Sequence, residues 1–185
     1  MESTNGDKAA KIAARETSLT TVMKTAAVLT ISDSCSRGER EDRSGPAVAE
    51  LLRQNGFEVH HQQVAPDDRR TIASLLMKLS EEVQLIVTTG GTGIAASDVT
   101  PEATRDVCSL FLDGIPEKMR AEGQRYTPLA ILSRGLCGVR DRTLILNLPG
   151  SPDGALQSLG AVIDILPHAI DLLAGKTEHE GRPIE

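Results

Sequence analysis

Residues 83–93 read Val-Gln-Leu-Ile-Val-Thr-Thr-Gly-Gly-Thr-Gly, an apolar run that passes directly into a glycine-rich turn. A short aliphatic and β-branched run of this kind predicts a buried strand. The glycines after it permit positive φ angles and a close approach of the backbone to a ligand, and successive exposed N–H groups can cradle a phosphate. A glycine-rich turn alone is more often only a turn. This one has neither the Gly-Lys-Ser/Thr ending of a Walker loop nor the dinucleotide fingerprint.

Strand-like and helix-like segments alternate on both sides of this turn. Further strands are predicted at residues 26–31, 57–64 and 143–148. Helices are predicted from Ser44 to Asn55-Gly56, from Pro66 through Leu79, from Pro101 with Thr100 as N-cap, over 117–124 and over 155–173. Such alternation predicts an α/β fold with a mostly parallel sheet covered on both faces. The loops that could carry chemistry all follow strands, where ligands of such sheets bind.

Length and composition indicate one domain with an aliphatic core. The chain has 185 residues, with two Phe, one Tyr and no Trp. We expect the domain to span residues 24–175, after a flexible N-terminal extension (1–23) and before a C-terminal tail (176–185). The net charge of −6 and the scarcity of aromatic residues argue against nucleic acid as a partner. They do not exclude a small anionic ligand held by backbone N–H groups and a metal.

Cysteine usage and hydropathy predict a cytoplasmic protein. The three cysteines show no paired spacing, which argues against a disulfide framework or a zinc site. No apolar stretch approaches the roughly 20 residues that span a bilayer, and the N-terminus lacks the apolar centre of a signal peptide. The four histidines show no metal-ligand spacing. Cys137 is expected to be inert, since nothing local marks a thiol of lowered pKa.

Two acids follow predicted strands at positions suited to a metal-bound phosphate. Asp98 lies a few residues after the glycine turn, just before a helix, and Asp67 follows Pro66 at the end of another strand. Each could equally cap a helix or complement its dipole. The functional interpretation is a magnesium site, because Mg²⁺ prefers one or two carboxylates together with waters and phosphate oxygens.

Two further loops are candidates for recognition. Residues 147–152 read Asn-Leu-Pro-Gly-Ser-Pro, and the prolines make a rigid backbone that suits a flat heterocycle. The plainer interpretation is a turn before a helix, with Ser151 as its cap. Residues 131–140 contain Arg134 and Arg140, for which a solvated basic loop is the default.

Several runs combine in a fixed order. They are Thr-Thr-Gly-Gly-Thr-Gly (88–93), Asp-Val-Thr-Pro-Glu-Ala-Thr (98–104), Ala-Ile-Leu-Ser-Arg-Gly (130–135) and Leu-Asn-Leu-Pro-Gly-Ser-Pro (146–152), preceded by Ser32-Asp33-Ser34 and Asp42-Arg43-Ser44-Gly45-Pro46. In this order they resemble the molybdopterin adenylyltransferase family, which includes the bacterial Mog proteins and the plant and gephyrin G domains. The resemblance covers about residues 24–175, and the runs are specific jointly rather than singly.

The resemblance implies a three-layer α/β/α sandwich, a homotrimer, and transfer of AMP from Mg-ATP to molybdopterin with release of pyrophosphate. It also implies a molybdate-inserting enzyme as a partner. By this resemblance Asp67 and Asp98 are the magnesium-linked catalytic acids. The binding residues that it implies are Asp33, Gly90, Gly91, Thr92, Gly93, Glu117, Ser133, Pro149, Gly150, Ser151 and Pro152.

One departure from the family pattern keeps alternatives open. Many adenylylating members have Arg immediately before the motif aspartate, where this chain has Ser97. A missing guanidinium removes a fork suited to phosphate, which Arg105, Arg134 or Arg140 could replace. A non-catalytic molybdopterin-binding paralogue is therefore the main alternative. A related domain of molybdate-inserting proteins and competence-damage-type pyrophosphatases is a third, although the intact run at 100–102 counts against it.

Overall fold

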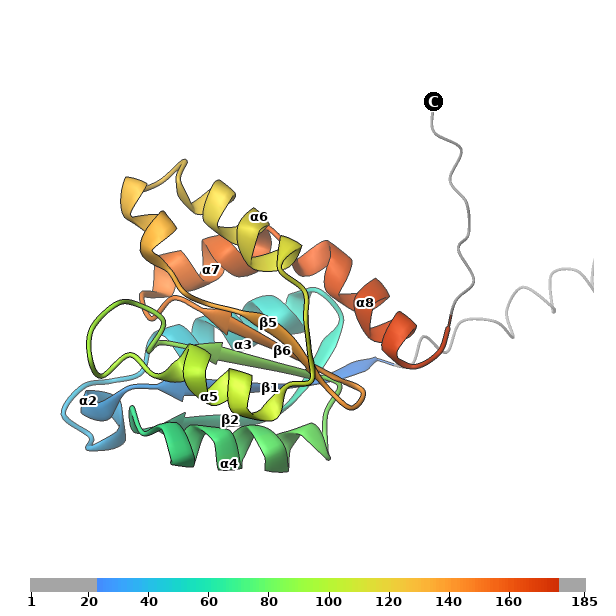
Figure 1. The fold of residues 1–185 in the computed structure, drawn as a ribbon, viewed down its shortest axis with the longest axis horizontal. Coiled ribbons are helices and arrows are strands. Elements are labelled where there is room, and N and C mark those ends of the chain that lie inside the picture. The colour runs from blue at the N-terminus through green and yellow to red at the C-terminus, as the bar shows by residue number, and fades with distance from the viewer. Residues whose placement is uncertain (1–22, 177–185) are drawn as a thin grey trace, which may run out of the picture.

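The computed structural model of the chain describes residues 23–176 (Figure 1). The predicted N-terminal extension, apart from Met23, and nearly all of the predicted tail lie outside these residues. The strands are β1 (Lys24–Ile31), β2 (Phe57–Ala65), β3 (Leu85–Thr89), β4 (Leu110–Phe111), β5 (Cys137–Arg140) and β6 (Thr143–Leu148). The helices are α2 (Asp33–Ser36), α3 (Ser44–Gln54), α4 (Arg69–Ser80), α5 (Thr100–Val107), α6 (Gly114–Gly123), η1 (Pro128–Leu132), α7 (Pro152–Gly160), η2 (Ile163–Ile165) and α8 (Leu166–Leu173).

The strands form one sheet in the order β2-β1-β3-β6-β5-β4. β2, β1, β3 and β6 are mutually parallel, whereas β5 and β4 are antiparallel additions at one side. The mostly parallel sheet is thus confirmed. From β1 the chain moves first to β2 on one side and then to β3 on the other, so the strand order reverses between β1 and β3. Ligands of open α/β sheets bind at such a switch point.

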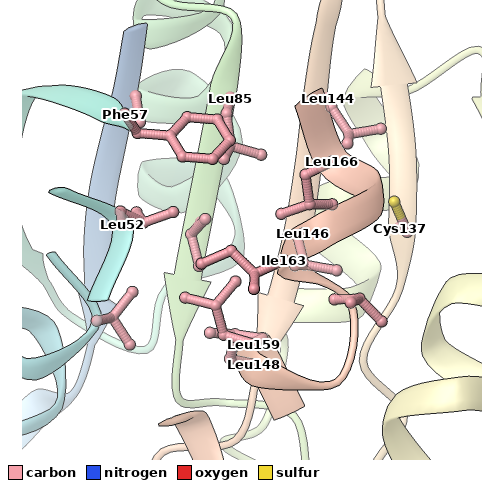
Figure 2. Close-up of a cluster of buried hydrophobic side chains, with 14 of the residues drawn as sticks. Leu52, Phe57, Leu85, Cys137, Leu144, Leu146, Leu148, Leu159, Ile163 and Leu166 are labelled. Atoms are coloured by element: carbon pink, nitrogen blue, oxygen red, sulfur yellow. The ribbon is translucent and has the colours of Figure 1, made fainter. Parts of the chain in front are cut away.

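Helices cover both faces of the sheet, which confirms the three-layer α/β/α prediction. Successive side chains of β1 point to opposite faces of the sheet, as they do in any β-strand. One face packs against α3, α6, α7, η2 and α8 through apolar side chains such as Met119 and Leu52, Leu159 and Ile163 (Figure 2). The other packs against α4 and α5 through Ile72, Leu76, Ala103 and others. Figure 1 shows α4 and α5 on one side and α6, α7 and α8 on the other.

The structure corrects several predicted elements. The long helix predicted over 155–173 is broken, with a bend of 47° between α7 and the η2–α8 segment. Gly160 ends α7, and Pro167 fits only in the first turn of a new helix. Residues 137–140, expected in a basic loop, form β5 instead. The short elements α2, β4 and η1, all of five residues or fewer, are not predicted by the sequence patterns.

Within residues 23–176 no single helix is long and apolar enough to cross a membrane; only the bent pair α7 and η2–α8 passes that test of length and composition together. Apolar residues of both members, including Leu159, Val162 and Leu166, belong to the core described above. Burial against the sheet therefore explains the apolar composition of this pair.

Strand register aligns the ends of the parallel strands. Ile31 of β1 lies beside Ala65 of β2, and Thr89 of β3 lies beside Leu148 of β6. The loops after these four strands therefore meet at one edge of the sheet, as the sequence predicts.

Candidate functional site

Two cavities open at this edge, on either side of the glycine turn. The polar cavity, of about 760 Å³, is lined by the end of β1 (30–32), the segment 40–44, Asp67, the turn 89–91, residues 97–98 and the loop 150–152. The apolar cavity, of about 380 Å³, is lined by residues 92–94, by α6, by η1 with Ser133, by 149–151 and by α7. Gly150 and Ser151 line both, so the cavities share a wall.

The glycine turn is held tightly between neighbouring elements. Gly90 and Gly91 have φ angles of 101° and 62°, a region in which side chains are strained. A Cβ on Gly90 would overlap the carbonyl oxygen of Ile31, and one on Gly91 would overlap the Thr100 hydroxyl. The Gly90 N–H donates to the Leu148 carbonyl at 3.1 Å. These positions therefore require glycine for backbone geometry and for space.

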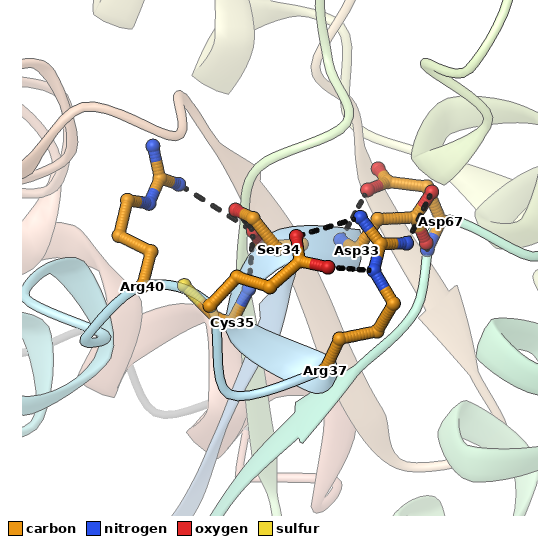
Figure 3. Close-up of polar contacts among 8 residues, drawn as sticks. Asp33, Ser34, Cys35, Arg37, Arg40 and Asp67 are labelled. Atoms are coloured by element: carbon orange, nitrogen blue, oxygen red, sulfur yellow. Dashed lines mark hydrogen bonds and ion pairs between the residues drawn. The ribbon is translucent and has the colours of Figure 1, made fainter.

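Asp67 is held at the edge of the polar cavity by Asp33. The N–H of Asp33 donates to Asp67 Oδ2 at 2.9 Å, and the N–H of Asp67 donates to Asp33 Oδ1 at 3.0 Å (Figure 3). The helix-cap interpretation of Asp67 is wrong, because the N-cap of α4 is Asp68, which accepts the Thr71 N–H at 2.8 Å. The Asp67 carboxylate is therefore not used to cap α4, and Asp67 lines the polar cavity.

Two neighbouring carboxylates act on Asp67 at this end of the cavity. Burial raises the pKa of Asp67, and the negative charges of Asp33 and Asp98 raise it further, against the hydrogen bond from the Asp33 N–H. Mutual repulsion of this kind makes the binding of a cation favourable.

Asp98 also lies on the polar cavity and is not a helix cap. Its Oδ2 accepts the N–H of Ala95 at 2.8 Å, which closes the short loop between the glycine turn and α5. The N-cap of α5 is Val99, and no side chain among residues 23–176 caps this helix. The prediction of Thr100 as N-cap is therefore wrong; its hydroxyl donates instead to the Gly90 carbonyl at 2.9 Å.

Arg134 braces the same loop. Its N–H donates to the Thr92 carbonyl at 2.8 Å, and its guanidinium donates to the carbonyls of Gly93 at 2.6 Å and Asp98 at 2.7 Å. The guanidinium also pairs with Glu102 on α5, and this hydrogen bond lowers the pKa of Glu102. The expectation of a solvated basic loop is wrong for Arg134, because its guanidinium is committed to the loop.

Asp42 anchors the segment that forms the opposite wall, a role that sequence analysis missed. Its carboxylate accepts the Thr30 hydroxyl at 2.7 Å, the Gly45 N–H at 3.0 Å and the Ser44 hydroxyl at 3.3 Å. The Thr89 hydroxyl donates to Ser44 Oγ at 2.6 Å, which joins β3 to the network. The signal that could have revealed this role is an acid placed two residues before a Ser-Gly-Pro helix start, within reach of the first helical N–H groups.

Most of the predicted binding residues line one cavity or the other. Gly90, Gly91 and Pro152 line the polar cavity, Thr92, Gly93, Ser133 and Pro149 line the apolar cavity, and Gly150 and Ser151 line both. Ser151 is also the N-cap of α7, accepting the Gly154 N–H at 3.2 Å. Asp33 adjoins the polar cavity through Asp67. Glu117 is exposed on α6 and lines neither cavity, so its binding role stays a prediction.

Two remaining expectations concern residues away from the cavities. Arg140 is only partly exposed: at the opposite edge of the sheet its guanidinium donates to Ser80 Oγ and to the Val107 carbonyl, each at 3.2 Å. Burial raises the pKa of Cys137 to about 12 and that of Cys108 to about 11. Both thiols are therefore protonated at neutral pH, which agrees with the expectation that Cys137 is inert.

The donor set of the polar cavity fits magnesium that arrives with a phosphate ligand. Asp67 and Asp98 each use Oδ2 in a hydrogen bond, and their Oδ1 atoms bond no residue within 23–176. In that same range no three His, Cys, Asp or Glu side chains are grouped to hold an ion by themselves. Two carboxylates completed by phosphate oxygens and waters are the set that Mg²⁺ prefers. Fold and site together define an α/β protein with a polar, carboxylate-bearing cavity at the switch point of its sheet.

The sequence is similar to that of a known protein family. Residues 27–168 match the family described as "Probable molybdopterin binding domain", and the chain belongs to it. The molybdopterin adenylyltransferase of Helicobacter pylori strain J99 is 46% identical over 153 residues, which cover 80% of this chain and 86% of that protein. The molybdopterin adenylyltransferase of Escherichia coli K12 is 36% identical over 165 residues, covering 80% and 84%. The similarity to these relatives places this chain in molybdenum cofactor biosynthesis.

The fold is likewise shared with a solved member. The crystal structure of the molybdopterin biosynthesis enzyme MoaB from Thermus thermophilus superposes with a TM-score of 0.79 at 48% identity. The match covers 83% of this chain and 98% of that one.

Proposed function

We propose that this chain transfers AMP from ATP to the terminal phosphate of molybdopterin and releases pyrophosphate. The observation that carries the proposal is the wall at Gly150 and Ser151 that the polar and apolar cavities share. Two phosphate-bearing substrates in adjoining cavities can meet end to end across the glycine turn. The names of the adenylyltransferase relatives support the same reaction.

The reaction requires the protein to position the two substrates and does not require a covalent enzyme intermediate. An oxygen of the molybdopterin phosphate attacks the α-phosphorus of ATP. The bond from that phosphorus to the oxygen bridging the α- and β-phosphates breaks, and pyrophosphate keeps the electron pair. Because the attacking phosphate is already an anion, no general base is required, and positioning and charge stabilisation dominate.

The glycine turn is suited to hold a phosphate by its backbone. The carbonyls of Gly91, Thr92 and Gly93 accept from Thr100 N–H, Arg134 N–H and the Arg134 guanidinium, respectively. The N–H groups of these three glycine-turn residues donate to no residue within 23–176. Successive backbone N–H groups without a protein acceptor can form a concave site that binds an anion. We assign the molybdopterin phosphate and the α-phosphate of ATP to the two sides of this turn.

Asp67 and Asp98 are the residues that would hold Mg²⁺ brought by the nucleotide. The ion, when bound, neutralises charge on the phosphates of ATP. Asp33 keeps the Asp67 carboxylate in place, and the Ala95 N–H does so for Asp98.

Pyrophosphate release from Mg-ATP with freshly prepared molybdopterin tests the reaction. Release that depends on molybdopterin and falls at least about 100-fold in Asp98→Asn, as expected for loss of a charge-stabilising group, supports the proposal. The substituted protein should still bind molybdopterin in a fluorescence titration, because Asp98 lines the polar cavity alone. Unchanged turnover in Asp98→Asn would refute the role of this carboxylate.

Ser97 favours a second candidate, a non-catalytic paralogue that binds molybdopterin. This residue is exposed at the polar cavity, at the position where the family resemblance leads to the expectation of Arg. The paralogue would bind molybdopterin with no pyrophosphate release at any ATP concentration. Ser97→Arg distinguishes the two, because it should create turnover only if the missing guanidinium is what prevents catalysis.

The proposal includes a cytoplasmic homotrimer that delivers its product to a molybdate-inserting enzyme. Exposed apolar side chains gather on η1 beside the apolar cavity, with Leu129 68%, Ile131 58% and Leu132 46% exposed. Apolar groups of this kind on a surface commonly mark protein contacts. Light scattering after gel filtration measures the mass of the assembly, and a monomer at micromolar concentration would refute the trimer.

A further inference from the structure

The polar cavity contains acidic side chains, yet its proposed ligand is an anion. Asp42, Asp67 and Asp98 all line it, and a triphosphate adds several negative charges. One Mg²⁺ ion does not balance this total, so positively charged side chains are needed as well. The position before Asp98, occupied by Ser97, does not supply one.

The arginines that sequence analysis considered do not reach this cavity. The Arg134 guanidinium is committed to Glu102 and to two loop carbonyls. Arg140 bonds Ser80 and Val107 at the far edge of the sheet. Arg105 is exposed on α5 and lines neither cavity. None of the three can replace the missing guanidinium.

Two other arginines line the polar cavity from the opposite wall. Arg43 is the N-cap residue of α3, and its neighbour Asp42 is fixed by three hydrogen bonds. The Arg43 side chain is 78% exposed, and its one ion pair among residues 23–176 is a 3.8 Å contact with Glu41, which is 81% exposed. Such a solvated pair is worth little. Within the described part of the chain, Arg40 makes one long hydrogen bond, 3.4 Å, to Ser32 Oγ (Figure 3).

Resting on the proposed function, we propose that Arg43, with Arg40 beside it, binds the β- and γ-phosphates of ATP and the departing pyrophosphate. The anchoring of Asp42 fixes the backbone of Arg43 while its guanidinium stays available, an arrangement suited to bidentate phosphate contacts. The positive charge that Ser97 does not supply is thus supplied from across the cavity. This wall makes no contribution to the apolar cavity, so the pair acts on the nucleotide and not on the pterin.

Isothermal titration with Mg-ATP and with inorganic pyrophosphate tests the assignment. Arg43→Ala should weaken both ligands about tenfold, and the double variant Arg40→Ala/Arg43→Ala about 30- to 100-fold, the range expected for charge-assisted hydrogen bonds. Arg43→Lys should recover part of the loss, because Lys keeps the charge but lacks the fork. Molybdopterin affinity, measured without nucleotide, should stay within about twofold.

Arg53→Ala is the matched control. Arg53 lies near the other end of α3, about 15 Å along the helix from Arg43 by its rise of 1.5 Å per residue. Arg53 lines neither cavity. The substitution therefore removes the same charge as Arg43→Ala but from outside the site. It should change the affinity for pyrophosphate less than about twofold, through long-range electrostatics alone.

The outcomes separate this inference from the proposed function. Wild-type affinity for both ligands in the double variant would overturn the role of the arginines while leaving the reaction in place. Equal losses in Arg53→Ala and Arg43→Ala would also overturn it, since net charge alone would then be responsible. Failure of the unsubstituted protein to bind Mg-ATP or pyrophosphate would refute the proposed function, and this assignment with it.

Discussion

Asp33 and Asp67 hold each other by a reciprocal pair of hydrogen bonds, each backbone N–H donating to the other carboxylate at 2.9 and 3.0 Å. The pair ties the loop after β1 to the loop after β2. It uses Oδ2 of Asp67 and directs Oδ1 toward Gly91, whose added Cβ would stand 3.2 Å from it. A bulkier residue at position 91 would therefore disturb this carboxylate as well as the turn.

Asp67→Asn should abolish turnover while making the folded protein more stable at neutral pH. The amide oxygen can still accept the Asp33 N–H, so the local structure persists, but the charge is lost. We expect pyrophosphate release to fall about 100-fold or more, as for other groups that stabilise charge in a transition state. Kinetics and thermal unfolding of the two proteins measured side by side check both parts.

The pH dependence follows from the raised pKa of Asp67. The folded state binds this proton more tightly than the unfolded chain, so stability is lost as the pH rises through the folded pKa. The stability difference between Asp67→Asn and the wild type should therefore grow from acidic to neutral pH. A difference that shrinks over that range would contradict the electrostatic account.

Arg134→Ala should destabilise the protein by about 1–3 kcal/mol, because it leaves Glu102 and two loop carbonyls without their donor. It should also lower turnover, since the loop that carries Asp98 loses its brace. Urea unfolding and pyrophosphate release measure the two effects. The control is Arg69→Ala, which removes a bidentate pair with Asp106 on the exposed side of α4 and α5.

The exposed pair should contribute much less to stability than Arg134, because water screens its charges, and its loss should leave turnover unchanged. Equal effects of the two substitutions would mean that Arg134 acts only as a surface ion pair.

Gly90→Ala should be among the most damaging single substitutions in the chain. It combines a strained φ of 101° with overlap on the Ile31 carbonyl, and we expect a loss of more than about 3 kcal/mol by denaturant unfolding. Gly38→Ala is the control, with a φ of 71° but nothing within 4 Å of the added Cβ. It should cost only about 1–2 kcal/mol, from backbone strain alone. Similar losses at the two sites would show that space around Gly90 is unimportant.

Cysteine alkylation should report on the polar cavity. At pH 8 a thiol of pKa about 11, such as Cys108, is thiolate in roughly one molecule in a thousand, and Cys137 in fewer, so both should react slowly. Cys35 lines the polar cavity and should react first with iodoacetamide, as located by peptide mass spectrometry. Saturating Mg-ATP should slow its alkylation. Equal rates with and without nucleotide would place the nucleotide elsewhere.

Sequence patterns predict the parts of the fold that local chemistry determines. The run at 85–89 and its glycine turn are recognisable because a buried parallel strand is continuously apolar and the turn demands glycine. By contrast, β5 is the four-residue stretch Cys-Gly-Val-Arg, whose strand state comes from pairing with β6 and β4 rather than from its own preference.

The site was predictable in its acids and less so in its arginines. Asp67 and Asp98 follow strands at the ligand-binding edge, which the order of elements already indicates. Whether Arg134 faces solvent or Glu102 depends on a contact across 32 residues of sequence, and no local pattern encodes that. The same holds for Arg43, because its proposed role depends on the segment 40–44 forming a wall of the polar cavity.

The wall formed by Gly150 and Ser151 limits how this protein can diverge. Because these residues face both cavities, a substitution at either position that adapts one pocket to a new ligand alters the other pocket at the same time. Changes in preference for one ligand can accumulate independently only on surfaces that belong to a single cavity, such as α6 and η1 on one side or residues 40–44 on the other. Evolution of new specificity should therefore be concentrated in those segments, with the shared loop left as the slowest part of the site to vary.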